Sequence, residues 1–464
     1  MSSTVEIDGS LDAAAAVFAA RRQDDPWFCF EQPDRGQYAV AALGQATRVE
    51  ARGADRFRAV AQRCRELARD AECGDDLVDL PPGAGPLFCG GFAFADTGGG
   101  SPEWSPFAPA QLVVPELSIL RRAGRAWVTL TALVDPSGVS GTAGALRPAT
   151  GAKGVPATSA AADPAAVAAR LEARLASLHP ASMPLLDPSP AQPARVAGAA
   201  PPEHYESAVA RAVELIGRGE VQKVVLAREV RVHAAAAIDP GAVFGALREV
   251  FPSCFTYCVG TSEGAFAGAS PELLVRRDGA RAQTVALAGT TRRSADPSVD
   301  DHLGEKLLHS AKEREEQAIV AARIERTLAP VSLWVAAADE PVLVKVQNVQ
   351  HLATPIRAQL REPVSAVELA GLLHPTPAVG GEPRERAIRL IPELEGLDRG
   401  WYAGPVGWMD LAEDGEFCVA LRGGLLRDRT AHLYAGCGIV RDSDPASELA
   451  ETEIKLQTML PLLA

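Results

Sequence analysis

The stretch VQKVVLAREV, residues 221–230, places one lysine against the start of a β-strand pattern. The run VVL that follows Lys223 favours a buried strand. Alternation along such a strand puts Lys223, Val225 and Ala227 on one face. One interpretation is an edge lysine whose ammonium reaches water along its own stem. The other is a lysine held in a site, where exclusion from water lets it lose its proton and act as a base.

Two further segments repeat one pattern of charge. In HSAKEREEQAIVAARIERTL, Glu313 and Glu316 lie three residues apart on a predicted helix, and therefore on one face. In SELAETEIKLQTML, Glu448 and Glu451 have the same spacing, and Lys455 lies one turn beyond Glu451. Each segment alone is typical of a solvated helix face with ion pairs. If the two helices face each other, the four carboxylates repel unless a cation lies between them, and all-oxygen ligation suits Mg²⁺.

Three short motifs could supply donors for an anion. LYAGCGIV places Gly436 and Gly438 after a predicted strand, where missing side chains let backbone N–H groups approach a carboxylate. VALRGG ends a strand with Arg422, whose guanidinium suits bidentate binding of a carboxylate. LAGTTRR is predicted to bring Gly289 and Thr290 into a tight turn. Each motif is equally compatible with ordinary turn chemistry.

A candidate acid lies in AGASPELLVRR, where Glu272 follows a proline at the start of an apolar run. If that carboxyl is buried, its pKa rises and it can donate a proton near neutral pH; it could equally cap a helix or strand. A base, an acid, a Mg²⁺ cluster and donors for carboxylates together favour lyase or isomerase chemistry on a small dianion. They do not name the substrate.

The elements that must position these residues fall into three regions. Residues 1–135 show helical and strand patterns and are predicted to form a mixed N-terminal lobe. Residues 136–200 are rich in Ala, Pro, Gly and Ser, which is typical of a linker or surface excursion, with one helical segment at 165–178. From residue 201 to 464 strands and helices alternate, beginning with a helix over 204–220 that leads into the lysine strand.

Composition excludes several classes of protein. A chain of 464 residues with 47% hydrophobic and 23% charged residues predicts two domains or one large unit. The net charge of −13 argues against nucleic-acid binding but not against an anionic substrate, since a site can be locally basic. The eight cysteines form no CxxC pair, and neither a GxxxxGK[ST] nor a GxGxxG nucleotide motif occurs. The N-terminus lacks signal-peptide character and no run of about 18 apolar residues occurs, so we expect a cytoplasmic protein without a membrane contact.

From about residue 201 to 464 the chain resembles the chorismate-binding enzymes, which comprise isochorismate synthases, salicylate synthases and the synthase subunits for anthranilate and aminodeoxychorismate. The matching motifs, in family order, are KVVLAR, GASPELL, LAGTTRR, KEREEQ, VQHLATPI, LHPTPAVGG, DRGWYAGPVGW, VALRGG, YAGCGIV and ELAETEIK. The N-terminal third carries the weaker echoes FCGGFAF and LVVPE. The resemblance implies an α+β fold, with antiparallel β-sheets in a sandwich flanked by helices, and a site in the cleft between the sheets.

The resemblance also implies roles for the candidate acid and base. Ammonia-using members generally carry glutamine at the position of Lys223, whereas water-using members carry lysine, so Lys223 is implied to be the general base. Glu272 matches the general acid that protonates the departing C4 hydroxyl. The implied reaction is Mg²⁺-dependent, reversible conversion of chorismate to isochorismate, in which water adds at C2 and the C4 hydroxyl leaves.

The remaining implied site residues surround the substrate and the metal. Glu316 and Glu451 match the Mg²⁺ ligands, with Glu313 and Glu448 as close or water-mediated partners. Residues matching the pocket for the enolpyruvyl carboxylate are Arg422, Tyr402 and the Gly436 amide. Residues matching positions around the ring and its carboxylate are Gly289, Thr290, His351, Thr376 and Lys455.

Several departures from the family pattern bear on the subfamily. Gln317 stands where many relatives have histidine, and the LLES motif of tryptophan feedback is absent. Tyr402 and Leu421 are residue types that also occur in salicylate synthases, which go on to eliminate pyruvate. HPTPAVGG and WYAGPVGW favour isochorismate synthases of the menaquinone type, and this is our interpretation. The alternatives are a salicylate synthase, an ammonia-using synthase subunit and a non-catalytic partner protein. We expect a monomer without an obligatory amidotransferase subunit.

Overall fold

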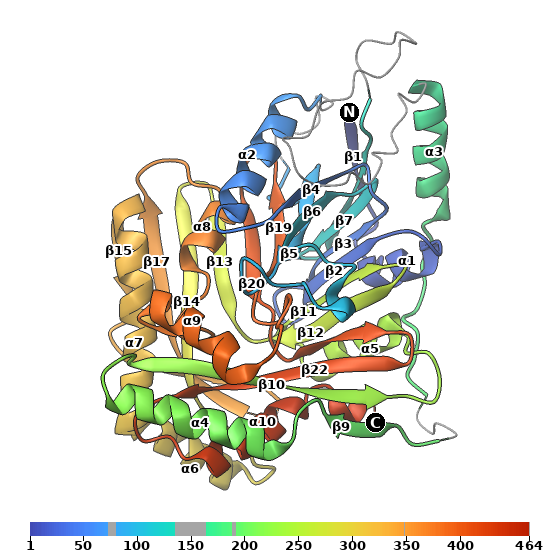
Figure 1. Ribbon diagram of the computed structural model, residues 1–464. Helices are drawn as coiled ribbons and strands as arrows, with labels where there is room; N and C mark the ends of the chain where they lie inside the picture. The colour runs from blue at the N-terminus through green and yellow to red at the C-terminus, as the bar shows by residue number, and fades with distance from the viewer. Residues whose placement is uncertain (73–79, 135–163, 188–191, 348, 464) are drawn as a thin grey trace.

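The computed structural model describes residues 1–72, 80–134, 164–187, 192–347 and 349–463 (Figure 1). Two large antiparallel β-sheets form the centre of this part of the chain. Helices surround the sheets, so that the fold is α+β, as the resemblance implied.

The first sheet contains twelve strands. In pairing order its strands are β1 (Ser2–Ile7), β8 (Arg125–Thr131), β7 (Leu117–Arg122), β3 (Tyr38–Leu43), β2 (Trp27–Gln32), β11 (Phe255–Thr261), β12 (Gly264–Ser270), β21 (Gly423–Arg427), β22 (Thr430–Ile439), β10 (Lys223–His233) and β18 (Gly381–Glu382), with β9 (Arg195–Gly198) also pairing with β10.

The second sheet contains ten strands. In pairing order they are β15 (Ser332–Ala337), β17 (Val349–Leu360), β14 (Arg281–Arg292), β13 (Leu273–Asp278), β20 (Gly415–Val419), β19 (Pro405–Asp410), β5 (Leu87–Phe92), β6 (Ala110–Val114) and β4 (Thr47–Ala51), with β16 (Val342–Lys345) also pairing with β17.

Ten α-helices occur in the described residues. They are α1 (Ala13–Ala20), α2 (Arg56–Arg69), α3 (Pro164–Ser177), α4 (Pro202–Gly217), α5 (Pro240–Val250), α6 (Pro297–His309), α7 (Ala311–Leu328), α8 (Ala366–Leu373), α9 (Arg384–Glu395) and α10 (Pro445–Leu456). Helices α4 and α10 pack together and lie against the β10–β22 end of the first sheet (Figure 1). None of the helices in the described part of the chain combines the length and apolar character needed to cross a bilayer.

The N-terminal and C-terminal regions share both sheets. Strand β2 pairs with β11, where Cys29 lies opposite Cys258, and β5 pairs with β19, where Gly90 lies opposite Gly407. The predicted division at residues 135 and 201 is therefore not a division of the sheets. These cysteines are unpaired and buried, as are the other cysteines of the described residues.

Helix α3 forms within the segment predicted to be a linker or surface excursion. Its Arg174 side chain is buried, and its two terminal nitrogens each lie 2.6 Å from a carboxylate oxygen of Asp25. Arg174 also donates to Glu116 at 3.0 Å. The helix is therefore attached to the N-terminal region by a buried ion-pair network, while residues 136–163 and 188–191 of the predicted segment lie outside the described residues.

The local sequence explains why the two helices and the strand that carry the site residues form where they do. Ser310 caps α7, and its hydroxyl accepts from the N–H of Glu313. Asp444 caps α10 in the same way, and a proline occupies the first turn. Strand β10 is rich in valine and pairs with β22 from Val224 to His233.

Two predicted turns are instead parts of strands. Gly436 and Gly438 lie inside β22, where they pair with Ala227 and Val225 of β10, because the ladder continues through both glycines. Gly289 lies inside β14 at an irregularity between Ala288 and Thr290, with φ of 73°. The left-handed glycine therefore belongs to a β-bulge and not to a turn.

Candidate active site

A cavity lies where both sheets meet α7 and α10. Strands β10 and β22 of the first sheet and β14 and β17 of the second line it. All of the predicted site residues except Lys223 and Thr376 line this cavity. These residues are Glu272, Gly289, Thr290, Glu313, Glu316, His351, Tyr402, Arg422, Gly436, Glu448, Glu451 and Lys455.

Lys223 lies just behind the cavity wall and is fully buried. Its Nζ lies 2.7 Å from Oε1 of Glu316, which does line the cavity. The neighbouring strand contributes Gly438 at this point: a Cβ there would lie 2.6 Å from Glu316 Oε1 and 2.8 Å from Lys223 Cε. Of the two interpretations of this lysine, the structure excludes the water-exposed edge position.

Glu272 follows β12 and is buried in the cavity wall. Its backbone is fixed from two sides, because its N–H donates to Ser270 Oγ at 3.2 Å and its carbonyl accepts from Val419 at 3.0 Å. Burial raises the pKa of Glu272 to about 8, although the Lys223 charge and the Thr376 hydroxyl oppose the rise. The carboxyl is therefore protonated at neutral pH. Thr376 is buried beside it, and its hydroxyl makes no well-formed hydrogen bond.

The four glutamates of α7 and α10 converge on the cavity. Burial and then the charge of Glu316 raise the pKa of Glu313 to about 7. Burial and then Glu451 raise the pKa of Glu448. Burial acts in the same direction on Glu451, but the Lys455 ammonium, 2.7 Å from its Oε1, holds its pKa below the ordinary value.

The residues of this cluster fit a hard divalent cation. Their donors are carboxylate oxygens, and mutual repulsion between them is incompletely compensated, as the raised pKa values of Glu313 and Glu448 indicate. Oxygens of Glu448 and Glu451 lie within 4.8 Å of each other and of Cys437 Sγ. Burial, with the charges of Glu451 and Glu448, raises the pKa of the Cys437 thiol although the Lys455 charge opposes the rise, so the thiol stays protonated and the carboxylates are the donors suited to Mg²⁺.

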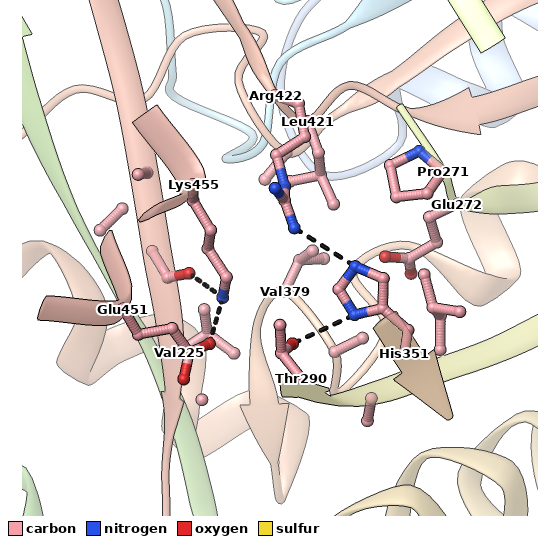
Figure 2. Close-up of a pocket in the computed structure, with 18 of the residues that line it drawn as sticks. Val225, Pro271, Glu272, Thr290, His351, Val379, Leu421, Arg422, Glu451 and Lys455 are labelled. Atoms are coloured by element: carbon pink, nitrogen blue, oxygen red, sulfur yellow. Dashed lines mark hydrogen bonds and ion pairs between the residues drawn. The ribbon is translucent and has the colours of Figure 1, made fainter. Parts of the chain in front are cut away.

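An arginine–histidine pair forms another part of the wall (Figure 2). Arg422 Nη2 donates to His351 Nε2 at 3.3 Å, and His351 Nδ1 lies 3.1 Å from Thr290 Oγ1. Burial and the Arg422 charge hold the pKa of His351 well below its usual range, so the ring is neutral. Because a guanidinium only donates, Nε2 accepts and Nδ1 carries the ring proton. Arg422 has a φ of 51°, an uncommon backbone conformation that aims it from the β20–β21 connection into the cavity.

Lys455 and two stacked tyrosines form the remaining wall. Lys455 Nζ donates to the carbonyl of Gly436 at 2.8 Å as well as pairing with Glu451 (Figure 2). Tyr402 stacks on Tyr434 with ring centroids 5.2 Å apart, and both line the cavity. The Lys455 ammonium thus lies beside the carboxylate cluster, and the two aromatic rings line the same cavity.

Sequence reasoning missed several residues of the wall. Lys312 precedes Glu313, and its Nζ lies 3.8 Å from Glu448 Oε1 across the helices. Arg399 and Val379 also line the cavity and lie in two of the quoted motifs, DRGWYAGPVGW and LHPTPAVGG, which by themselves indicate no role for either residue. Position inside these motifs was the signal available for both.

In chemical terms, the cavity and the residues just behind its wall combine a buried carboxylic acid, a buried lysine, a cluster of carboxylate oxygens suited to a divalent cation and an arginine that faces the cavity. Such a set suits proton transfer at opposite ends of a small anionic molecule.

Comparisons with known proteins agree with this chemistry. A family model described as chorismate binding enzyme matches residues 1–143 and 156–464. The salicylate biosynthesis isochorismate synthase of Pseudomonas aeruginosa is 35% identical over 471 residues, covering 100% of this chain and 90% of the other. Isochorismate synthase MenF of Bacillus subtilis is 41% identical over 261 residues, which is 56% of this chain and 55% of the other.

A solved structure resembles the whole chain. The menaquinone-specific isochorismate synthase MenF from Escherichia coli has a TM-score of 0.79 at 27% identity, covering 100% of this chain and 95% of the other.

Proposed function

The chain belongs to the chorismate-binding enzymes, and from that membership we propose that it converts chorismate to isochorismate with its own Lys223 and Glu272 as base and acid. The observation that carries the proposal is the placement of these two residues. Lys223 is buried behind Glu316 on one side of the cavity, and Glu272 is buried in the wall with a pKa of about 8. The reaction is an isomerisation in which a hydroxyl is exchanged between two ring carbons.

Each proton transfer has a defined donor and acceptor. Lys223 takes a proton from the water whose oxygen bonds to C2. The ring double bonds shift, and the C4–O bond breaks. Glu272 gives its proton to the departing C4 hydroxyl, which leaves as water. Lys223 ends protonated and Glu272 ionised, so a return of the proton between them restores the enzyme.

Binding groups hold the two carboxylates of the substrate. Arg422 is oriented by its hydrogen bond to the neutral His351 and is suited to the enolpyruvyl carboxylate, with Tyr402 and the Gly436 amide beside it. The ring carboxylate is directed to the side of Lys455, Thr290 and the glutamate cluster. Glu316 and Glu451, with Glu313 and Glu448 close by, would hold Mg²⁺, which when bound supplies positive charge for the ring carboxylate.

Lysine at position 223 favours water over ammonia as the nucleophile, so we propose that no amidotransferase subunit is required and that the chain acts as a monomer. Tyr402 and Leu421, whose residue types also occur in salicylate synthases, both line the cavity and support a second candidate function. In that candidate, a salicylate synthase, isochorismate loses pyruvate in the same site.

Product analysis separates these reactions. The purified protein is incubated with chorismate, with and without Mg²⁺, and the products are separated by chromatography while pyruvate is assayed. We expect Mg²⁺-dependent isochorismate without pyruvate. Salicylate with stoichiometric pyruvate would place the chain with the salicylate synthases. Turnover only with added ammonia would contradict the role of Lys223.

A further inference from the structure

A buried ion pair lies at the wall of the cavity, where Arg399 lines it and Glu395 lies behind. Glu395 is the last residue of α9, and Arg399 follows four residues later. Their side chains are 0% and 3% exposed, and Arg399 Nε lies 3.0 Å from Glu395 Oε2. Removing two charges from water is costly, so a buried pair of this kind is weak evidence of a contribution to stability. Its other hydrogen bonds indicate what it does.

Those hydrogen bonds end on the backbone of two segments of the cavity wall. Arg399 donates from Nη2 to the carbonyl of Val225 and from Nη1 to the carbonyl of Val379, each at 2.9 Å. Glu395 Oε1 accepts from the N–H of Ala227 at 2.6 Å. Val225 and Val379 belong to β10 and to the segment between α8 and β18, and both line the cavity (Figure 2). The pair therefore joins two chain segments that are remote in sequence.

Each joined segment lies beside one of the proposed proton-transfer groups. Lys223 is two residues before Val225, on the same face of β10. Thr376, which lies beside Glu272, is three residues before Val379. The backbone around Arg399 is itself fixed, because the Asp398 carboxylate accepts from the N–H groups of Gly99 and Ser101 at 3.0 and 2.9 Å.

We infer that Glu395 and Arg399 are positioning residues, which set the spacing between the strand of the base and the segment beside the acid. This inference rests on the proposed function. The pair touches neither the base nor the acid and acts through the carbonyls of Val225 and Val379. A guanidinium is required, since one planar group must reach both carbonyls and the carboxylate at once, and an ammonium cannot span them.

The discriminating variant is Arg399→Lys, which keeps the positive charge beside Glu395 but loses the double contact to the carbonyls. We expect its kcat for isochorismate formation to fall by about 10- to 100-fold, as small misplacements of reacting groups do. The KM for chorismate should change by less than about 3-fold, because Arg422 and His351 are untouched. The alkaline limb of the pH–rate profile should also move, because the surroundings of Glu272 change.

A matched control separates positioning from stability. Arg277 forms another buried ion pair, with Asp414 at 2.7 Å, and also donates to a backbone carbonyl, that of Ala412 at 2.8 Å. It does not line the cavity. Arg277→Lys should lower the melting temperature as Arg399→Lys does but leave kcat and the pH profile unchanged.

The double variant Glu395→Gln with Arg399→Met removes both charges while glutamine keeps an acceptor for Ala227, so no buried ion is left unpaired. It should fold and show the same loss of kcat.

If Arg399→Lys and the double variant retain kcat and the pH profile while the wild type forms isochorismate, the positioning role is wrong and the proposed function stands. If Arg277→Lys loses as much kcat as Arg399→Lys for a similar fall in melting temperature, the role of the pair is structural and the inference is likewise overturned. A folded wild type that makes nothing from chorismate overturns the proposed function and the inference with it.

Discussion

Lys223 Nζ lies 2.7 Å from Glu316 Oε1, and this contact joins strand β10 to helix α7. The lysine is fully buried, whereas the glutamate faces the cavity. The proposed base and the proposed cation-binding cluster are thus directly connected. A substitution at either residue changes the surroundings of the other.

Replacement of the base gives the first prediction. Lys223→Gln keeps a polar side chain next to Glu316 but cannot take a proton from water. We expect isochorismate formation to fall by at least about 100-fold, the usual contribution of a general base. Chromatographic product analysis measures the loss, and circular dichroism checks that the variant is folded. Lys306→Gln, on the exposed side of α6, is the control and should retain full activity. Full turnover in Lys223→Gln would rule out the proposed base.

The titration of Glu272 gives the second prediction. A general acid must be protonated, and burial raises the pKa of Glu272 to about 8. Isochorismate formation should therefore decline as the pH rises through about 8. His351 should contribute no limb near neutrality, because burial and Arg422 hold its pKa well below the usual range. A rate profile between pH 6 and 10 tests this, and Glu272→Gln should lose activity at every pH.

The same carboxyl should make stability depend on pH. Its folded pKa of about 8 lies above the ordinary value of 4.5, so the folded state binds the proton more tightly than the unfolded state. The stabilisation is complete below about pH 4.5 and is lost as the pH rises through about 8. The melting temperature of wild type relative to Glu272→Gln should therefore fall between pH 6 and 9. A constant difference would show that Glu272 has an ordinary pKa.

Local patterns predicted much of this site. The spacing of the glutamates placed Glu313 with Glu316 and Glu448 with Glu451 on single helix faces, and both pairs line the cavity. Strand alternation predicted that Lys223, Val225 and Ala227 share one face of a strand. Val225 and Ala227 line the cavity, as the glutamates do. Such periodicities depend only on backbone geometry, which is why they can be read from a single sequence.

Other features depend on contacts between distant segments. The glycines of YAGCGIV were predicted to follow a strand, but pairing of β22 with β10 extends the strand through them. Arg399 received no role because its partners, Val225 and Val379, are 174 and 20 residues away. The left-handed backbone of Arg422 likewise follows from its place between two sheets, not from its neighbours in sequence.

The space at Gly438 gives the fourth prediction. The residue lies inside a strand, so alanine strains no backbone there, but its Cβ would lie 2.6 Å from Glu316 Oε1 and 2.8 Å from Lys223 Cε. Gly438→Ala should displace this pair and lower kcat by about 10-fold or more. Gly217→Ala is the control, since no atom lies within 4 Å of its added Cβ at the end of α4. The control should keep full activity and gain up to about 1 kcal/mol of stability. Equal activity in both variants would show that the Lys223–Glu316 contact tolerates movement.

The carboxylate cluster gives the last prediction, which separates metal binding from catalysis. Chelation should abolish isochorismate formation and Mg²⁺ should restore it, while the protein stays folded, because both sheets and the core are built without the cluster. Calorimetric titration of the chelator-treated protein with Mg²⁺ gives the affinity directly. Glu451→Gln should weaken that affinity by about 10-fold or more, since loss of a ligand charge is not recovered by an amide oxygen. Glu453→Gln, two residues along α10 but off the cavity wall, should bind Mg²⁺ as wild type does. Mg²⁺ affinity that is equal in the two variants would place the cation away from α10 and leave Lys455 as the principal counter-charge of Glu451.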